Sequence, residues 1–193
     1  AQLAEDIGAE NLKKKAEEMG FGKNFSFDSV TTTKSSTNLS SFTSAIDLAW
    51  SSVGQADVMA NPYHMALLMG AIANGGKAAE PYLILRTESA LGLPSLPHFT
   101  TRTGTLISAA SLHSMMRNNV VNYYGEYLFD GYSLCAKTGT AELDDKNPNC
   151  WIVGFSEGES TPYAFAVCVQ EGSSGLYTAG EVVSAALNAI TGN

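Results

Sequence analysis

The chain has 193 residues and a formal net charge of −8, with 45% hydrophobic and only 16% charged residues. This length and composition predict one well-buried globular domain, residues 1–193, rather than a disordered chain or two very small domains. The negative charge argues against nucleic acid or an anionic membrane surface as the main partner, and no apolar run reaches the length of a membrane span.

The N-terminal part predicts helices separated by a polar loop. Residues 1–19 carry apolar residues at helical spacing, with an interruption at Gly8 and an end at Gly20. Residues 26–41 are rich in Ser and Thr without periodicity, which predicts a surface loop, and a short helix is expected at about 43–51. Because the chain starts inside a predicted helix, we expect it to be a fragment of a longer protein.

The middle of the chain contains a helix with clear end signals. Asn61 is a candidate N-cap, Pro62 suits the first helical position, and Gly75 or Gly76 can end the helix. Residues 81–85 then predict a strand, and residues 88–104 predict a loop or irregular hairpin.

The last third predicts a sheet. A helix at 108–124, ended by Gly125, is followed by three strand-like runs separated by turn residues, and short connections favour antiparallel pairing. The expected strands are 132–143, 150–156 and 163–170, and the expected final helix is 178–190. The predicted class is α+β, with a three-stranded antiparallel sheet packed by helices.

The most informative motif is Lys137-Thr138-Gly139-Thr140, which lies on the first of these strands. It offers a cation, two hydroxyls and a residue without a side chain, which suits docking of an extended peptide with a free carboxylate. Lys-Thr-Gly is one signature of penicillin-binding proteins and class A β-lactamases. The alternative is an ordinary edge strand whose lysine discourages aggregation.

Other motif matches are weaker. Residues 154–158 fit G-x-S-x-G, but a strand follows and no histidine comes later in the chain, so a hairpin turn is expected. Residues 131–138 resemble a phosphate-binding loop with Ala136 in place of the required glycine. Ser36-Thr37-Asn38 matches S-x-N in a tract where chance would produce it. No lysine has a serine three positions before it, so no S-x-x-K is present.

Metal and cofactor sites are not expected. None of the three histidines is spaced with a second histidine or a cysteine for metal binding, and a structural role is expected for each. The three cysteines lie in apolar runs and predict buried free thiols. These residues are His64, His98 and His113, and Cys135, Cys150 and Cys168.

An ordered series of segments resembles the transpeptidase domain of class B penicillin-binding proteins. The matching segments, in the family's order, are residues 1–22, Gly54-Gln55, Asn61-Pro62 with Met65-Ala66, 73–76 with Pro81, 137–142 and 151–155. Asn61 stands where Thr or Ser is usual, and Ala136 stands where glycine is common. The resemblance covers almost the whole chain.

The resemblance implies a truncated penicillin-binding or serine β-lactamase-like fold and a peptidoglycan D,D-transpeptidase. Lys137, Thr138, Gly139 and Thr140 would bind the substrate, with Lys137 and Thr140 assigned to catalysis. The attacking serine and the S-x-N motif would lie upstream of Ala1, so the fragment alone is expected to be inactive.

The implied partners are a stem peptide ending in D-Ala-D-Ala and β-lactam antibiotics. The implied location is the extracytoplasmic face of the bacterial cell membrane, with the anchor outside this chain. An edge-paired or swapped homodimer of the fragment is also expected, because sheet strands would be missing. The alternative function is a non-catalytic module that binds peptide termini or muropeptides.

Overall fold

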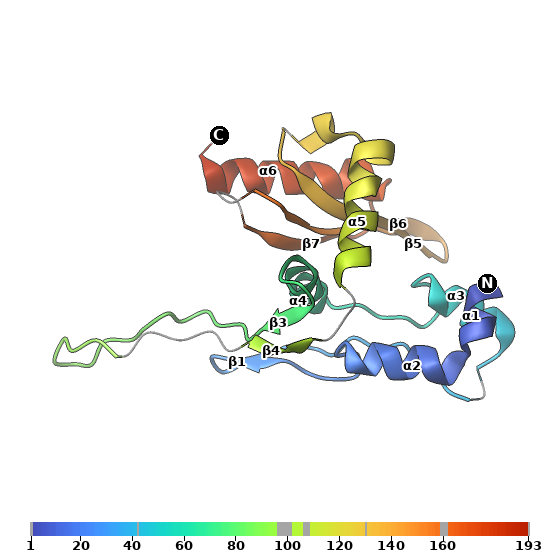
Figure 1. The fold of residues 1–193 in the computed structure, drawn as a ribbon, viewed down its shortest axis with the longest axis horizontal. Helices are drawn as coiled ribbons and strands as arrows, with labels where there is room; N and C mark the ends of the chain where they lie inside the picture. Colours follow the sequence, from blue (N-terminus) through green and yellow to red (C-terminus); the bar gives the residue numbers. More distant parts are fainter. Residues whose placement is uncertain are drawn as a thin grey trace.

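The structure is a computed structural model that describes residues 2–41, 43–95, 102–105 (backbone only), 109–129, 131–158 and 162–192. It is a mixture of helices and antiparallel strands, as the composition of predicted elements indicated (Figure 1). No helix within these ranges combines the length and the apolar character needed to cross a membrane.

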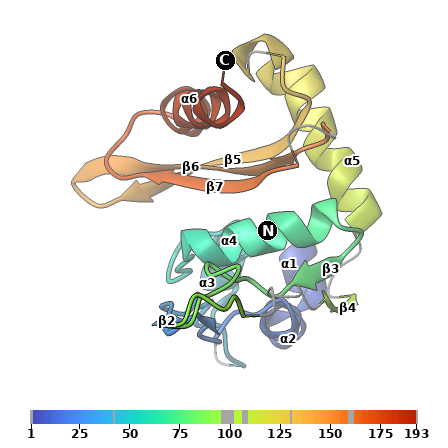
Figure 2. The ribbon, with the colours of Figure 1, turned by 90° about the vertical axis from the view of Figure 1, so that its left-hand side faces the viewer.

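The centre of the molecule is a three-layer arrangement. Strands β5 (Leu134–Leu143), β6 (Lys146–Ser156) and β7 (Ala164–Val169) form an antiparallel sheet in the order β5-β6-β7. Helix α6 (Gly180–Thr191) covers one face, and α4 (Pro62–Ala73) covers the other (Figure 2). The predicted three-stranded sheet is therefore confirmed.

Two hydrophobic cores occupy the two faces of the sheet. Successive side chains of a strand point to opposite faces, so Leu134 and Ala136 belong to the core under α6, whereas Cys135 belongs to the core against α4. Val183 and Leu187 of α6 complete the first core. The same alternation determines toward which face of the sheet the side chain of each later residue of β5 points.

The β5–β6 connection is tighter than the sequence predicted. A turn was expected over 144–148, but β6 begins at Lys146, which pairs with Leu143, so the turn is Asp144-Asp145. Pro148 is tolerated inside β6 because the register shifts in this part of the ladder, where a proline does not break a regular hydrogen bond.

A helical segment along one side of the sheet leads into β5 (Figure 2). Helix α5 (Ala109–Asn119) continues into a π-helical turn, η1 (Val120–Tyr124), and Gly125 ends it with a φ of 93°, as the sequence predicted. A 3-10 turn, η2 (Glu126–Phe129), leads to β5.

The remaining elements form the lower part of Figure 1. The predicted N-terminal helix is confirmed as two pieces separated at Gly8, and the short third helix starts after the N-cap Ser44. The elements are α1 (Gln2–Ile7), α2 (Ala9–Glu18), α3 (Ala45–Ser52), β1 (Ser26–Phe27), β2 (Val30–Thr31), β3 (Lys77–Ala79) and β4 (Arg102–Thr105).

Two predictions in this part were wrong. The polar tract 26–41 is not only surface loop, because β1 and β2 pair within it and Ser35 is fully buried. Residues 81–85 do not form a strand; β3, just before them, pairs with β4 instead. The Asp28 carboxylate accepts hydrogen bonds from the Leu83 and Ile84 amides and so replaces strand partners there.

The start of α4 is anchored by a buried histidine. Asn61 caps the helix by accepting from the Tyr63 amide, as predicted. His64 Nε2 lies 2.9 Å from the Met19 carbonyl, which can only accept, so the proton sits on Nε2 and Nδ1 accepts from the Ser35 hydroxyl. Burial lowers the pKa of His64. The predicted structural role of His64 is confirmed, and His98 lies outside the described residues.

The cysteines are free thiols. Cys135 and Cys150 are buried, and Cys168 is half-buried, which agrees with the sequence prediction for the first two.

Candidate active-site strand

Strand β5 carries the Lys-Thr-Gly-Thr motif at the edge of the sheet. Its only strand neighbour within the described residues is β6, so its other edge faces away from the sheet. Lys137 and Thr140 are exposed, and Thr138 and Gly139 are half-buried. The motif therefore lies where a ligand could reach its exposed side chains.

The outward backbone groups of β5 are met by side chains from distant segments. Asn119 Nδ2 donates to the Ala136 carbonyl at 3.2 Å, and Gln55 Nε2 donates to the Thr140 carbonyl at 3.3 Å. Between them, the Thr138 amide donates to the Tyr124 hydroxyl at 3.1 Å. Because alternate residues of a strand present their backbone groups to the same side, the Thr140 N–H also points outward.

The motif side chains divide between the two faces of β5. Lys137 leaves on the α4 face, and its Nζ donates to the neighbouring Thr138 carbonyl at 2.5 Å. The Thr138 and Thr140 side chains point toward the α6 face. The Thr138 hydroxyl lies 3.2 Å from the Tyr124 hydroxyl, and the Thr140 hydroxyl accepts from the Gly175 amide at 3.4 Å. The ammonium and the two hydroxyls thus approach the edge from opposite sides.

Two glycines outside the motif allow close packing against β5. A Cβ at Gly154 would lie 2.4 Å from the Cys135 carbonyl oxygen, and one at Gly175 would lie 2.5 Å from the Gly139 carbonyl oxygen. At Gly139 itself, an added Cβ would make only an ordinary 3.5 Å contact with Trp151. The backbone at Gly175 therefore lies close to the Gly139 carbonyl, and it is Gly175 that has no room for a side chain.

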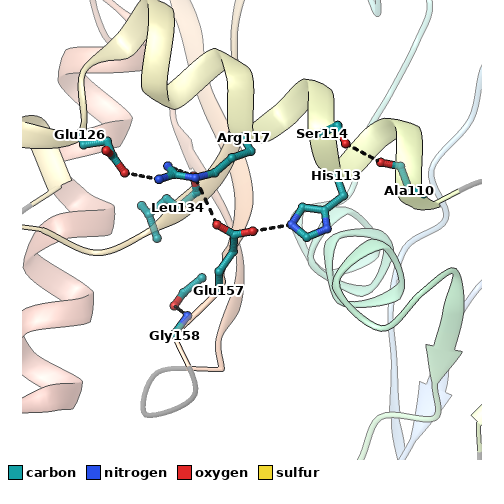
Figure 3. A network of polar contacts seen from close by, with 9 residues as sticks. Ala110, His113, Ser114, Arg117, Glu126, Leu134, Glu157 and Gly158 are labelled. Atoms are coloured by element: carbon teal, nitrogen blue, oxygen red, sulfur yellow. Dashed lines mark hydrogen bonds and ion pairs between the residues drawn. The ribbon is translucent and has the colours of Figure 1, made fainter.

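A charged network holds the start of β5 to α5 (Figure 3). Arg117 donates from Nη1 to the Leu134 carbonyl, pairs through Nη2 with Glu126, and pairs through Nε with Glu157 at 3.1 Å. Glu157 also lies 2.7 Å from His113 Nε2. The expected structural role of His113 agrees with this contact.

Sequence reasoning missed most of these supporting residues. Gln55 belonged to a matched segment, but its contact with Thr140 spans 85 positions, and Tyr124 and Thr138 are 14 positions apart. No spacing rule connects such residues. A predicted edge strand leaves backbone groups that need partners. Hydroxyl and amide side chains at the end of a neighbouring helix are the candidates for those partners.

Two other places have simpler explanations. Ser36 pairs with Met59 through backbone hydrogen bonds, and the Asn38 side chain donates to the Asp57 carbonyl. The tripeptide Ser36-Thr37-Asn38 therefore binds the stretch of chain just before α4. A surface hollow near β1 and β2 is lined by Gly22, Asn24 and residues 31–34.

Comparisons with known proteins agree on one family. Residues 1–191 match the model of the penicillin binding protein transpeptidase domain. The chain is 33% identical over 160 residues to the peptidoglycan D,D-transpeptidase PbpA of Mycolicibacterium smegmatis, covering 76% of this chain and 31% of that protein.

Solved structures give the same fold. The D,D-transpeptidase domain of a peptidoglycan glycosyltransferase from Eggerthella lenta has a TM-score of 0.81 at 26% identity, covering 99% of this chain and 50% of that one. Penicillin-binding protein A from M. tuberculosis, as an imipenem acyl-enzyme complex, has a TM-score of 0.82 at 23% identity, covering 98% and 44%.

The chain spans half or less of the length of these relatives. The predicted fold class, α+β of the penicillin-binding type, is confirmed. The family model covers nearly every residue, and the ordered segments that suggested the resemblance include parts of α1, α2, α4 and the central sheet. The chain belongs to the penicillin-binding protein transpeptidase-domain family.

Proposed function

We propose that this chain is the part of a peptidoglycan D,D-transpeptidase that holds the substrate, and that it cannot form an acyl-enzyme alone. The observation that carries the proposal is the outward edge of β5. There the Thr140 N–H points away from the sheet, with the Lys137 ammonium and the motif hydroxyls beside it.

The proposed substrate is a stem peptide ending in D-Ala-D-Ala. Lys137 would exchange its contact with the Thr138 carbonyl for the terminal carboxylate of the peptide, which is a stronger, charge-assisted partner. The Thr138 and Thr140 hydroxyls would add donors to the same carboxylate. This binding mode uses groups already present at the edge.

Thr140 would also act in catalysis through its backbone. An outward N–H is suited to stabilise the oxyanion that forms when a carbonyl is attacked, and loss of one such donor costs about 3 kcal/mol of transition-state stabilisation. The Gln55 side chain, held on the carbonyl of the same residue, would fix the orientation of this part of the strand. Gln55 is thus a positioning residue.

The chemistry also needs a nucleophile that this sequence does not provide. None of its eight lysines has a serine three positions earlier, so the S-x-x-K serine that would attack the peptide carbonyl is not among residues 1–193. In the proposed reaction that serine displaces D-Ala, and an amine of a second stem peptide then resolves the acyl-enzyme. A β-lactam would stop the sequence at the acyl stage. The longer protein would act at the extracytoplasmic face of the bacterial cell membrane.

The test uses a longer natural chain that includes the S-x-x-K and S-x-N motifs upstream of Ala1. We expect fluorescent penicillin to label it, and Lys137→Ala to slow labelling by about 10- to 100-fold, because a hydrogen bond to a charged group contributes about 1.5–3 kcal/mol. Lys146→Ala is the matched control, since Lys146 is exposed on the β5–β6 hairpin and pairs only loosely with Glu171.

Equal labelling rates in the two variants would contradict the role of Lys137. A folded longer chain that stays unlabelled, yet binds muropeptides, would support the binding-module alternative instead.

We also propose that any pairing of two copies through the sheet uses β7. The outward carbonyls of Ala136 and Thr140, and the Thr138 amide, already have partners, so β5 offers few groups to a second strand. Strand β7 has a strand neighbour on one side only within the described sheet. Sedimentation over a range of concentrations tests whether two copies pair at all, and a monomer at the highest concentration would rule out the homodimer.

A further inference from the structure

Three potential metal ligands converge beside the start of β5. His113 lies on α5, Cys135 is the second residue of β5, and Glu157 directly follows β6. One atom from each, the imidazole nitrogen, the thiol sulfur and a carboxylate oxygen, lies within 4.8 Å of the other two. Nothing in the sequence spacing indicated this cluster, because the fold brings the three together.

The backbone holds these three residues in place. Cys135 pairs with Phe155 across the β5–β6 ladder, and the Glu157 amide donates to the Ser133 carbonyl at 2.9 Å, so both residues are fixed at the same end of the hairpin. His113 packs edge-on against the Phe155 ring, with the ring centroids 5.2 Å apart. Cys135 therefore lies on β5 and His113 on α5, and Glu157, just past the end of β6, is held by the hydrogen bond of its amide.

The ligand types, one nitrogen, one sulfur and one carboxylate oxygen, suit a small, borderline-soft divalent cation. Zn²⁺ binds nitrogen and oxygen at about 2.0–2.2 Å and sulfur at about 2.3 Å, so tetrahedral ligand atoms lie about 3.3–3.6 Å apart. His113 Nε2 and Glu157 Oε1 are 2.7 Å apart and would separate by about 0.6 Å to admit the ion. Their side chains are 41% and 33% exposed, so they can make this adjustment, and the open side leaves room for a water as fourth ligand.

The surrounding charges favour an ion at this position. The Glu157 carboxylate receives Arg117 on Oε2, which leaves Oε1 directed at His113. Arg117 is in turn paired with Glu126. With Zn²⁺ bound, the thiolate and the Glu157 carboxylate would balance the ion, while Glu126 would balance Arg117. The loaded cluster would thus carry no net charge.

We propose that His113, Cys135 and Glu157 form a Zn²⁺ site, with three protein ligands and one open position, that links α5 to the start of β5. Zn²⁺ would take the place of two protons, the Cys135 S–H proton and the proton on His113 Nε2 that faces Glu157. Both would pass to solvent, and the neutral imidazole would carry its remaining proton on Nδ1. The site lies two residues before Lys137, so the ion would hold the front of the motif strand. This role is separate from peptide binding and does not depend on the proposed transpeptidase function.

The test is titration of the metal-stripped 193-residue chain with Co²⁺, a spectroscopic substitute for Zn²⁺. We expect one Co²⁺ per chain, with the near-ultraviolet thiolate-to-cobalt charge-transfer band and the visible bands of a tetrahedral ion. Native mass spectrometry after dialysis against Zn²⁺ should show one retained ion per chain. The Cys168→Ser variant is the matched control, because Cys168 is a free thiol in the same sheet, and it should behave like the parent chain.

The charge-transfer band should disappear in Cys135→Ser, and affinity should fall at least tenfold in His113→Ala, whose exposed side chain can be removed without opening the core. Because Cys135 is fully buried, its variant could misfold, and His113→Ala then carries the test. Absence of stoichiometric binding to the parent chain, retention of the band in folded Cys135→Ser, or unchanged affinity in His113→Ala would each overturn the proposal.

Discussion

The Tyr124 hydroxyl provides a direct test of how the motif strand is held. Replacing Tyr124 with Phe removes one oxygen atom and leaves the ring in place. That oxygen accepts from the Thr138 amide at 3.1 Å and lies 3.2 Å from the Thr138 hydroxyl. Thr138 is half-buried, so its amide would lose its partner where water only partly replaces it. We therefore expect the free energy of unfolding to fall by about 1–2 kcal/mol.

The local effect should appear at one amide. A loss of 1–2 kcal/mol corresponds to roughly a five- to thirty-fold change in an opening equilibrium. Hydrogen exchange measured by NMR should show faster exchange of the Thr138 amide by about that factor, and urea unfolding should report the global loss.

Tyr123→Phe is the matched control, because the adjacent ring is 75% exposed and its hydroxyl should be hydrated. It should change neither stability nor Thr138 exchange. If Tyr124→Phe and Tyr123→Phe are indistinguishable in both measurements, the proposed anchoring of β5 is refuted.

Two further predictions concern the core. His64 is held neutral by burial, with its pKa lowered in the folded state, so the unfolded chain binds the proton more readily. The contribution of neutral His64 to the free energy of unfolding should be fully present above its ordinary pKa of about 6.5 and should be lost as the pH drops below that value. Equal urea midpoints at pH ~7.5 and ~5.5 would contradict this prediction. Gly154→Ala should lower the free energy of unfolding by about 2–3 kcal/mol, because the new Cβ would lie 2.4 Å from the Cys135 carbonyl oxygen. Gly70→Ala in α4 is its control: its Cβ would meet only Ala164 at 3.7 Å, and its thermal midpoint should stay equal or rise.

The sequence predicted the elements whose signals are local. Asn61 and Pro62 set the start of α4, Gly125 ended the helical segment before the sheet, and Gly8 divided the first helix. These outcomes depend on caps and backbone conformations that a few adjacent residues determine.

The two wrong predictions have one cause: these residues form hydrogen bonds with residues that are distant in the sequence. Residues 81–85 have the apolar composition of a strand, but Asp28 takes two of their amides and no strand lies beside them. Ser35 sits in a polar tract that looked like surface, yet it is buried because His64 and the Asn61 amide bond to its hydroxyl. Composition alone does not reveal such partners.

The candidate site shows the same division. The Lys137–Thr140 motif was recognisable from four letters and its neighbours, and the structure places it at a sheet edge. Tyr124 and Asn119, which hold that edge, come from a helix end that packs beside β5. The sequence could not place them there, because their role follows from where α5 and η1 cross the sheet.

The intact mass of this 193-residue chain after prolonged exposure to a penicillin shows whether the chain can form an acyl-enzyme alone. We expect an unmodified mass for this chain, and one covalent adduct in parallel on the longer natural chain that supplies the S-x-x-K serine. A stoichiometric penicilloyl adduct on the 193-residue chain would contradict the claim that it grips the substrate without the residue that attacks it.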